Sequence, residues 1–277
     1  MRNALPLAGL LARVAAVGLL LALPGCSAAA GSDSIAGRDS LVVGVKADQP
    51  GLGLAGPGGT FRGFEVEVGR YIARHMGASR VGFKAVTSEN RERLLDAGEV
   101  DLVLASYSIT ADRSTKVTFG GPYYVAHQDI MVRRGDDRIR TVRDLAGRRM
   151  CQAAGSVSTE RVIEGLGVRT GLVPAPSYAA CVDRLLDGGV DAVSTGDLVL
   201  AGFAARSRAS LRIVNAPFTE ERYGVGLRKG DIDGCEAVNK AITEMYQTGS
   251  AQRMLRVWFG STGLRLTGSV PEFEGCS

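Results

Sequence analysis

The chain of 277 residues predicts an α/β fold with mostly parallel sheets. Two observations lead to this class. Short apolar runs such as 100–105 are typical of buried strands, and longer stretches with one apolar face are typical of helices. The two kinds of segment alternate along the chain, an order that places helices against a parallel sheet. Ligands of such sheets bind outside the carboxyl ends of the strands, so a site is expected in the residues that follow them.

The first half of the chain contains three predicted strands and two predicted helices. The expected elements are a strand over 41–45, a loop over 50–59, a helix over 65–76, a strand over 81–86, a helix over 88–96, a strand over 100–105 and an extended run over 123–132. Phe64, Val68 and Ile72 are spaced to form one apolar face on the first helix. Ser88 is expected to cap the second helix, because a serine hydroxyl accepts hydrogen bonds from free N–H groups at a helix start.

The second half continues the alternation of strands and helices. The expected elements are a turn over 142–147, a strand over 148–152, a helix that opens after Gly155, a helix over 177–187, a strand over 189–193, a helix over 198–205, an apolar run over 211–214, and helices over 235–247 and 250–259. The length suits one or two domains, and 45% hydrophobic residues are sufficient for their cores.

The charge of the chain is modest. The formal net charge is +4, and it falls to +2 if a leader that contains Arg2 and Arg13 is removed. The sequence has no basic tract with interleaved aromatic residues, which argues against nucleic acid as a partner.

The amino terminus has the pattern of an export signal. Within 1–25, two arginines flank a region that leads into an apolar stretch too short to span a bilayer. It ends in Leu23-Pro24-Gly25-Cys26, which resembles a lipobox, so Cys26 is expected to carry a lipid. Two acyl chains are sufficient for stable anchoring to the outer face of the cell membrane. Cleavage as an ordinary signal peptide is the alternative. Residues 26–38, rich in Ala, Gly and Ser, are expected to form a flexible tether.

Four further cysteines in an exported chain allow three disulfide pairings. The favoured pairing joins Cys151 to Cys181, which would tie two neighbouring strand ends. Its second bridge joins Cys235 to Cys276 and would hold the C-terminal tail. Zinc ligation is the alternative, but the sequence has no C-x-x-C spacing and only two histidines. No metal or cofactor is therefore expected.

A polar block follows the strand over 100–105. Ser106-Tyr107-Ser108-Ile109-Thr110-Ala111-Asp112-Arg113 brings hydroxyl groups, the start of a helix and an arginine to the carboxyl end of that strand. Free N–H groups and hydroxyls can bind an anion, and the planar guanidinium binds a carboxylate through two hydrogen bonds. The block therefore predicts a carboxylate receptor.

This block and four other motifs resemble the family 3 extracellular solute-binding proteins, the amino-acid receptors of ABC importers. The other motifs are Gly63-Phe64-Glu65-Val66-Glu67-Val68, Phe119-Gly120-Gly121-Pro122-Tyr123-Tyr124, Asp191-Ala192-Val193 and Tyr223-Gly224-Val225-Gly226. The resemblance covers about 39–259. The stretches Lys46–Gly53 and Gly121–Ala126 most resemble the glutamate-binding lipoproteins of actinobacteria.

The resemblance implies a two-lobed, type II periplasmic-binding-protein fold, with a mostly parallel sheet and flanking helices in each lobe. The implied ranges are 39–122 and 224–277 for lobe 1, 128–218 for lobe 2, and 123–127 and 219–223 for the two crossings between them. Such a fold can close on a ligand about a hinge. A monomer is expected.

The resemblance also implies the residues that hold the backbone groups of an amino acid. Arg113 would pair with the α-carboxylate, and Ser108 would add its hydroxyl and N–H to the same group. Ser106 would offer its carbonyl to the α-ammonium. Across the cleft, the N–H of Val157 and the side chain of Ser158 would complete the site.

The chain departs from the family at the ammonium position. Relatives usually carry an aspartate three residues after the Asp191-Ala192-Val193 motif, whereas this chain has Gly196 there and Asp197 one position later. Three alternatives are open: Asp197 reaches the site, Thr195 and backbone carbonyls replace it, or the ligand is not a standard α-amino acid.

The side-chain pocket is expected to favour an acidic ligand. Receptors for neutral or basic amino acids often carry an acid near the end of the first strand, where this chain has Lys46. A lysine there would attract a ligand carboxylate, which favours glutamate or aspartate; a solvated lysine is the alternative. Arg62 and Arg91 are secondary candidates. Ser88 stands where many relatives have an aromatic platform, so the pocket is expected to be polar.

A receptor that delivers glutamate or a related amino acid to an ABC permease is the leading interpretation. One alternative is a lipid-anchored sensor. The other is a dehydratase on the same fold that acts on an acidic substrate, but the sequence shows no nucleophile with a neighbouring base, so no enzyme activity is expected.

Overall fold

The computed structural model describes residues 34–266 and 268–277. The predicted leader over 1–25, the lipidated Cys26 and the first part of the tether lie outside the described residues. The last part of the predicted tether is packed on the folded body, because Ile35 is buried and its N–H donates to Asp231 Oδ2 at 3.0 Å.

The elements alternate as expected. The strands of the described part are β1 (Ser40–Val45), β2 (Asp48–Gln49), β3 (Gly53–Ala55), β4 (Phe61–Arg62), β5 (Arg80–Ala85), β6 (Leu102–Leu104), β7 (Val117–Arg133), β8 (Arg149–Ala153), β9 (Gly171–Ala175), β10 (Val193–Gly196), β11 (Leu211–Ile213) and β12 (Thr219–Arg228). The helices are α1 (Phe64–His75), α2 (Arg91–Asp96), α3 (Ala111–Ser114), α4 (Ser158–Glu160), α5 (Tyr178–Leu186), α6 (Asp197–Arg206), α7 (Ile232–Gln247) and α8 (Ser250–Phe259). Short turns are η1 (Pro57–Gly59), η2 (Val142–Leu145) and the π-helical η3 (Arg161–Gly165).

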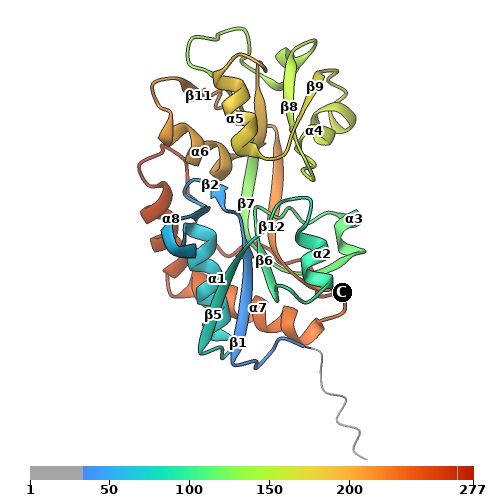
Figure 1. Cartoon of the computed structure of the whole chain (residues 1–277), viewed down its shortest axis with the longest axis vertical. Coiled ribbons are helices and arrows are strands. Elements are labelled where there is room, and N and C mark those ends of the chain that lie inside the picture. Colours follow the sequence, from blue (N-terminus) through green and yellow to red (C-terminus); the bar gives the residue numbers. More distant parts are fainter. Residues whose placement is uncertain (1–33, 267) are drawn as a thin grey trace, which may run out of the picture. The chain divides into compact units, whose positions relative to one another are not determined.

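One large sheet runs through the body in the order β10-β7-β12-β6-β1-β5, and β11 also pairs with β7. Figure 1 shows β7 and β12 side by side between a lobe that contains β1, β5, α1 and α7 (lobe 1) and a lobe that contains β8, β9, α5 and α6 (lobe 2). Strands β5, β1 and β6 are parallel, as are β8 and β9, whereas β7 and β12 pair in antiparallel fashion. The predicted α/β class and two-lobed fold are confirmed. The sheet is mixed rather than mostly parallel because the chain crosses between the lobes in opposite directions.

Helix α1 illustrates why the sequence forms these elements. Phe64, Val68 and Ile72 are fully buried on one face, as their spacing predicts. Two acidic residues lie in its first turn and two basic residues in its last, which suits the helix dipole.

The predicted cap at Ser88 is wrong. Helix α2 begins at Arg91, and the preceding residues form a turn in which Thr87 N–H donates to Asn90 Oδ1 at 2.8 Å and Asn90 N–H donates to Thr87 Oγ1 at 3.1 Å. This reciprocal pair fixes the turn without Ser88, whose hydroxyl instead accepts a hydrogen bond from Lys46.

The predicted strand over 189–193 is shifted toward the carboxyl terminus. Gly188 has a positive φ of 77°, and the Asp191 carboxylate accepts a hydrogen bond from the Arg149 N–H at 2.9 Å, so the chain is still turning there. Strand β10 begins only at Val193 and ends at Gly196. Asp197 is therefore the first residue of α6, one residue before the predicted start of that helix at 198.

Both favoured disulfides are present. Cys151 is bonded to Cys181, which joins β8 to α5, and Cys235 is bonded to Cys276, which holds the tail on α7. The predicted pairing is confirmed, and these four cysteines are not available as zinc ligands.

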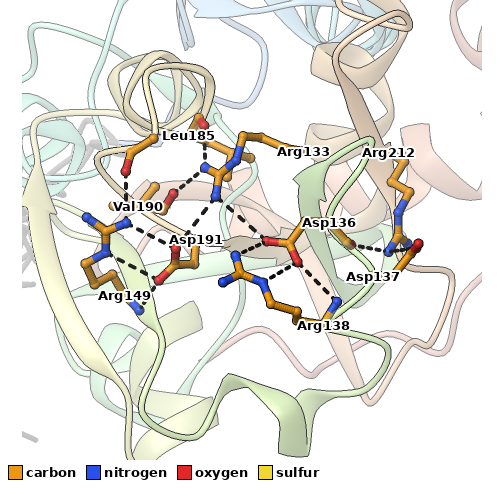
Figure 2. A network of polar contacts seen from close by, with 10 residues as sticks. Arg133, Asp136, Asp137, Arg138, Arg149, Leu185, Val190, Asp191 and Arg212 are labelled. Atoms are coloured by element: carbon orange, nitrogen blue, oxygen red, sulfur yellow. Dashed lines mark hydrogen bonds and ion pairs between the residues drawn. The ribbon is translucent and has the colours of Figure 1, made fainter.

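Figure 2 shows a network of polar contacts at the end of lobe 2. We call it the arginine–aspartate network, and its charged members are Arg133, Asp136, Asp137, Arg138, Arg149, Asp191 and Arg212. Arg133 also donates to the carbonyls of Leu185 and Val190, at 2.8 and 2.6 Å. The network thus ties the end of β7 to β8, α5 and β11. Each of its arginines contacts a carboxylate.

No helix of the described residues is long and apolar enough to cross a membrane.

Candidate ligand-binding site

Two adjoining cavities lie between residues of lobe 1 and residues of lobe 2. The smaller one, which we call the inner cavity, has a volume of about 10 Å³. It is lined by Gln49, Ser88, Arg91, Ser106, Ser108, Arg113, Ser156, Val157, Ser158, Tyr178, Thr195 and Glu221. The larger one, the outer chamber, has a volume of about 430 Å³, and Lys46 and Asp48 are among its lining residues. Gln49, Ser88 and Tyr178 border both cavities. Most of the predicted site residues are therefore brought together.

Arg113 lies between the lobes. Its Nη1 donates to the carbonyl of Ser108 at 2.9 Å, and its Nη2 donates to the carbonyl of Gly155, in lobe 2, at 3.0 Å. Thr110 caps the short α3 and so fixes the start of the turn that carries Arg113. Burial lowers the pKa of the guanidinium from its ordinary value. Both hydrogen-bond acceptors of the guanidinium are backbone carbonyls, so its charge has no carboxylate partner in the described part of the chain.

The two predicted serines of lobe 1 are oriented by acidic neighbours. Ser106 has an unusual positive φ of 47°, and its N–H donates to Glu65 Oε1 at 2.6 Å. The Ser108 hydroxyl donates to Glu221 Oε2 at 2.9 Å. Glu65 lies behind Ser106 and also accepts from the Tyr123 hydroxyl at 2.5 Å. These contacts fix the conformation of the loop that follows β6.

Lobe 2 contributes a small hydroxyl cluster. Ser158 Oγ lies 3.4 Å from Thr195 Oγ1 and accepts from the Tyr178 hydroxyl at 3.1 Å. Val157 precedes α4, and its N–H has no hydrogen-bond partner among the described residues. The cluster offers donors at the wall that faces Arg113.

Gly155 is a point at which the backbones of the two lobes approach closely. Its φ is +69°, and a Cβ at this position would lie 2.5 Å from the Ser88 carbonyl carbon and 2.6 Å from Glu89 N. Only glycine allows this backbone-to-backbone contact.

Lys46 and Arg91 are two further buried cations. Lys46 is 5% exposed, and its Nζ donates to Ser88 Oγ at 2.7 Å. Burial, aided by the charge of Arg91, lowers the pKa of Lys46 to about 7. Arg91 is 1% exposed, donates to the Ala105 carbonyl at 3.1 Å and lies over the Tyr107 ring at 3.6 Å from its centroid. Burial, with the charge of Arg113, lowers the pKa of Arg91 to about 9.

None of these three cations forms an ion pair with a carboxylate of the described residues. A buried charge without a partner costs several kcal/mol. These three residues thus place positive charge at the walls of the two cavities without an ion-pair partner in the described part of the chain.

Two predicted candidates lie elsewhere. Asp197 does not line the inner cavity; it lies near the Tyr124 hydroxyl at 3.4 Å and His127 Nδ1 at 3.6 Å. Burial raises its pKa to about 6. Arg62 is exposed on β4 and lines neither cavity.

Glu221 is the functional candidate that the sequence reasoning missed. It lies on β12, is 2% exposed and lines the inner cavity, whereas its neighbour Glu220 is exposed. The two-residue period of a strand places Glu221 on the same face as the buried Tyr223. The position of Glu221 two residues before Tyr223 was the available signal. Gln49, Ser156 and Tyr178 were also missed.

A two-lobed α/β fold with a polar, cationic cavity between its lobes defines a receptor for a small anionic or zwitterionic solute. The sequence matches the bacterial extracellular solute-binding proteins, family 3, over residues 41–261, and the chain belongs to this family.

Three known proteins illustrate the relationship. The glutamate-binding protein GluB of Corynebacterium glutamicum is 36% identical over 265 residues, which cover 90% of this chain and 89% of that protein. The ABC transporter glutamine-binding protein GlnH of Bacillus subtilis is 28% identical, and the match covers 81% of this chain and 83% of that protein. The structure of an ancestral arginine-binding protein bound to arginine matches with a TM-score of 0.74 and 31% identity, over 81% of this chain and all of that one.

Proposed function

We propose that this protein is a lipid-anchored receptor that binds an amino acid with two carboxylates, glutamate in the first place, and delivers it to an ABC importer. The support for import is the family and its relatives. The choice of ligand depends on the cavity.

The observation that carries the choice is the presence of three buried cations without ion-pair partners among the described residues. Glutamate brings two carboxylates to Lys46, Arg91 and Arg113. Arg113 and Ser108 would hold the α-carboxylate, and Lys46 with Arg91 would hold the side-chain carboxylate near Ser88. Glutamine would leave the second pair of cations without a partner, and arginine would add a like charge to them. Both should therefore bind less tightly.

Closure of the lobes would complete the site. In the proposed sequence, the ligand first binds lobe 1, and lobe 2 then adds the Val157 N–H and Ser158. The crossings over 123–127 and 219–223 would act as the hinge between 39–122 with 224–277 and 128–218. The contact between Arg113 and Gly155, 3.0 Å from Nη2 to the carbonyl oxygen, joins the two walls directly.

The lipid anchor and the partner proteins are part of the same proposal. Cys26 in its lipobox would hold the receptor on the outer face of the membrane, and the closed form would dock on the permease. Incorporation of labelled fatty acid into the parent chain, and its loss in Cys26→Ser, tests the anchor. Retention of the label in the variant would contradict it.

The ligand is tested by calorimetric titration with glutamate, aspartate, glutamine and arginine. We expect glutamate to bind most tightly, and Lys46→Met to weaken glutamate binding more than glutamine binding. Lys84→Met is the matched control, because Lys84 lies on the neighbouring β5 but is 43% exposed and pairs with Glu99. Tighter binding of glutamine or arginine by the parent protein would contradict the choice of glutamate.

The two alternatives differ from an import receptor in the fate of the bound ligand. A sensor would bind glutamate without supporting its uptake, so uptake by cells that lack the receptor gene decides between sensor and importer. A dehydratase would consume an acidic substrate that carries a hydroxyl group, so release of a dehydrated product from such a ligand would favour the dehydratase.

A further inference from the structure

We infer that Glu221 supplies the negative charge that holds the α-ammonium group of the ligand, in place of the acid that this chain lacks at position 196. This inference depends on the proposed function, since it requires the ligand to be an amino acid.

Position 196 cannot carry the acid because another side chain occupies the space. A Cβ on Gly196 would overlap the Tyr223 hydroxyl and would lie 3.2 Å from the Cβ of Ala126. Tyr223 is fully buried, so it has little room to move away. Strand β10 therefore cannot provide an aspartate at position 196, and the negative charge that balances the ligand ammonium must come from another element.

Glu221 is the acidic residue among those that line the inner cavity, and it is 2% exposed. Its Oε2 accepts from the Ser108 hydroxyl at 2.9 Å, and the carbonyl of the same serine accepts from Arg113 Nη1 at 2.9 Å. A carboxylate and a guanidinium are thus placed on either side of one residue. An α-amino acid carries its ammonium and carboxylate on the same carbon, so their binding groups must be neighbours in this way.

The second oxygen of Glu221 retains the capacity to accept a hydrogen bond. Oε1 lies 2.6 Å from Arg161 Nη1, but the two atoms are not aligned for a hydrogen bond, and neither has another hydrogen-bond partner in the described residues. A carboxylate oxygen has two lone pairs, so Oε1 can accept a further hydrogen bond beside its ion pair with Arg161. An ammonium group, with three N–H donors, would supply this hydrogen bond.

Arg161 competes with the ligand for the charge of Glu221. It comes from η3 of lobe 2, whereas Glu221 comes from β12, and its positive charge offsets that of the carboxylate. Because Arg161 and the ligand ammonium would share one carboxylate, removal of Arg161 should strengthen the hold of Glu221 on the ammonium.

The test compares glutamate with glutarate, which has the same two carboxylates and no ammonium. We expect Glu221→Gln to weaken glutamate binding by about 30-fold or more and to change glutarate binding by less than about threefold. Glu220→Gln is the control, because it makes the same chemical change on the adjacent, exposed residue. It should alter neither affinity.

Two results would overturn the inference: an equal loss for both ligands in Glu221→Gln, which would show that Glu221 only positions Ser108, or no loss for glutamate. Arg161→Met provides an independent measurement if Glu221→Gln does not fold. It should raise the ratio of glutamate to glutarate affinity, and a lowered ratio would contradict the inference.

Titrations of the parent protein distinguish a failure of the proposed function from a failure of the inference about Glu221. If it binds a different amino acid, the choice of glutamate is wrong. The same comparison with that amino acid and its desamino form then still tests Glu221. If it binds glutarate but no amino acid, both proposals fail.

Discussion

Two arginine-rich regions of this protein differ in whether their arginines have carboxylate partners. In the arginine–aspartate network of lobe 2, every arginine contacts an aspartate, as in the pair Arg149 and Asp191 at 3.1 Å (Figure 2). In the inner cavity, Arg91 and Arg113 are more deeply buried, yet the groups that accept their hydrogen bonds are backbone carbonyls.

The presence or absence of a carboxylate partner indicates whether a buried arginine serves stability or ligand binding. A paired arginine has its charge satisfied within the fold, so its contribution is to stability. An unpaired buried arginine is unfavourable in the free protein and becomes favourable when an anion binds. The residue type alone does not distinguish the two cases, but the partners do.

The largest expected effect is that of Arg113→Met. We expect the affinity for glutamate to fall at least about 100-fold, since one partner of a buried charge pair is removed. The midpoint of thermal unfolding should stay the same or rise, because the variant no longer buries an unpaired charge. Calorimetry and a thermal melt measure both quantities. A marked fall in stability with little loss of affinity would place Arg113 in the scaffold.

The second effect is a pH dependence of binding. Since the pKa of Lys46 in the free protein is lowered to about 7, mainly by burial, the lysine is largely neutral above that pH. A ligand carboxylate raises this pKa again, so binding takes up a proton, and the affinity should fall as the pH rises from 7 to 9. The decrease should reach about tenfold and be smaller in Lys46→Met, in which only Arg91, whose pKa is lowered to about 9, still loses charge toward the upper end of this range. Titrations at several pH values measure it, and a flat profile in the parent would contradict it.

The smallest effect concerns the arginine–aspartate network. Asp191→Asn removes the charge that pairs with Arg149 at 3.1 Å and Arg133 at 3.6 Å. We expect a loss of about 1.5 kcal/mol in the free energy of unfolding, typical of hydrogen bonds to charged groups. The affinity for glutamate should be unchanged. Denaturant unfolding measures the stability and calorimetry measures the affinity of the same sample. A loss of affinity at constant stability would contradict the assignment of this network to stability alone.

The sequence was sufficient for the fold class, the family and both disulfides. Helix α8 has the predicted bounds, because its apolar face is spaced regularly and Gly249 precedes it. Local patterns failed where distant contacts decide. The sequence around Ser88 does not indicate that its hydroxyl accepts a hydrogen bond from Lys46, which is 42 residues away in the chain.

The cavity was predictable only in part for the same reason. Serines and an arginine after β6 follow from the rule for strand ends, but Glu221 lies on a strand that returns from lobe 2, and its contact with Ser108 spans 113 residues. Asp197 was a candidate by its nearness in sequence to Gly196. The register of β10 and the position of Tyr223 place it near His127 instead.

The contact at Gly155 has a consequence for protein engineering. Because any side chain there would meet the backbone of Ser88 and Glu89, the wall between the lobes is fixed at this point. The outer chamber beside it, about 430 Å³ in volume, lies within the usual range of small-molecule sites and is bordered by ordinary side chains such as Ser177 and Asn90. Redesign toward bulkier solutes would therefore begin at the outer chamber and leave the glycine unchanged.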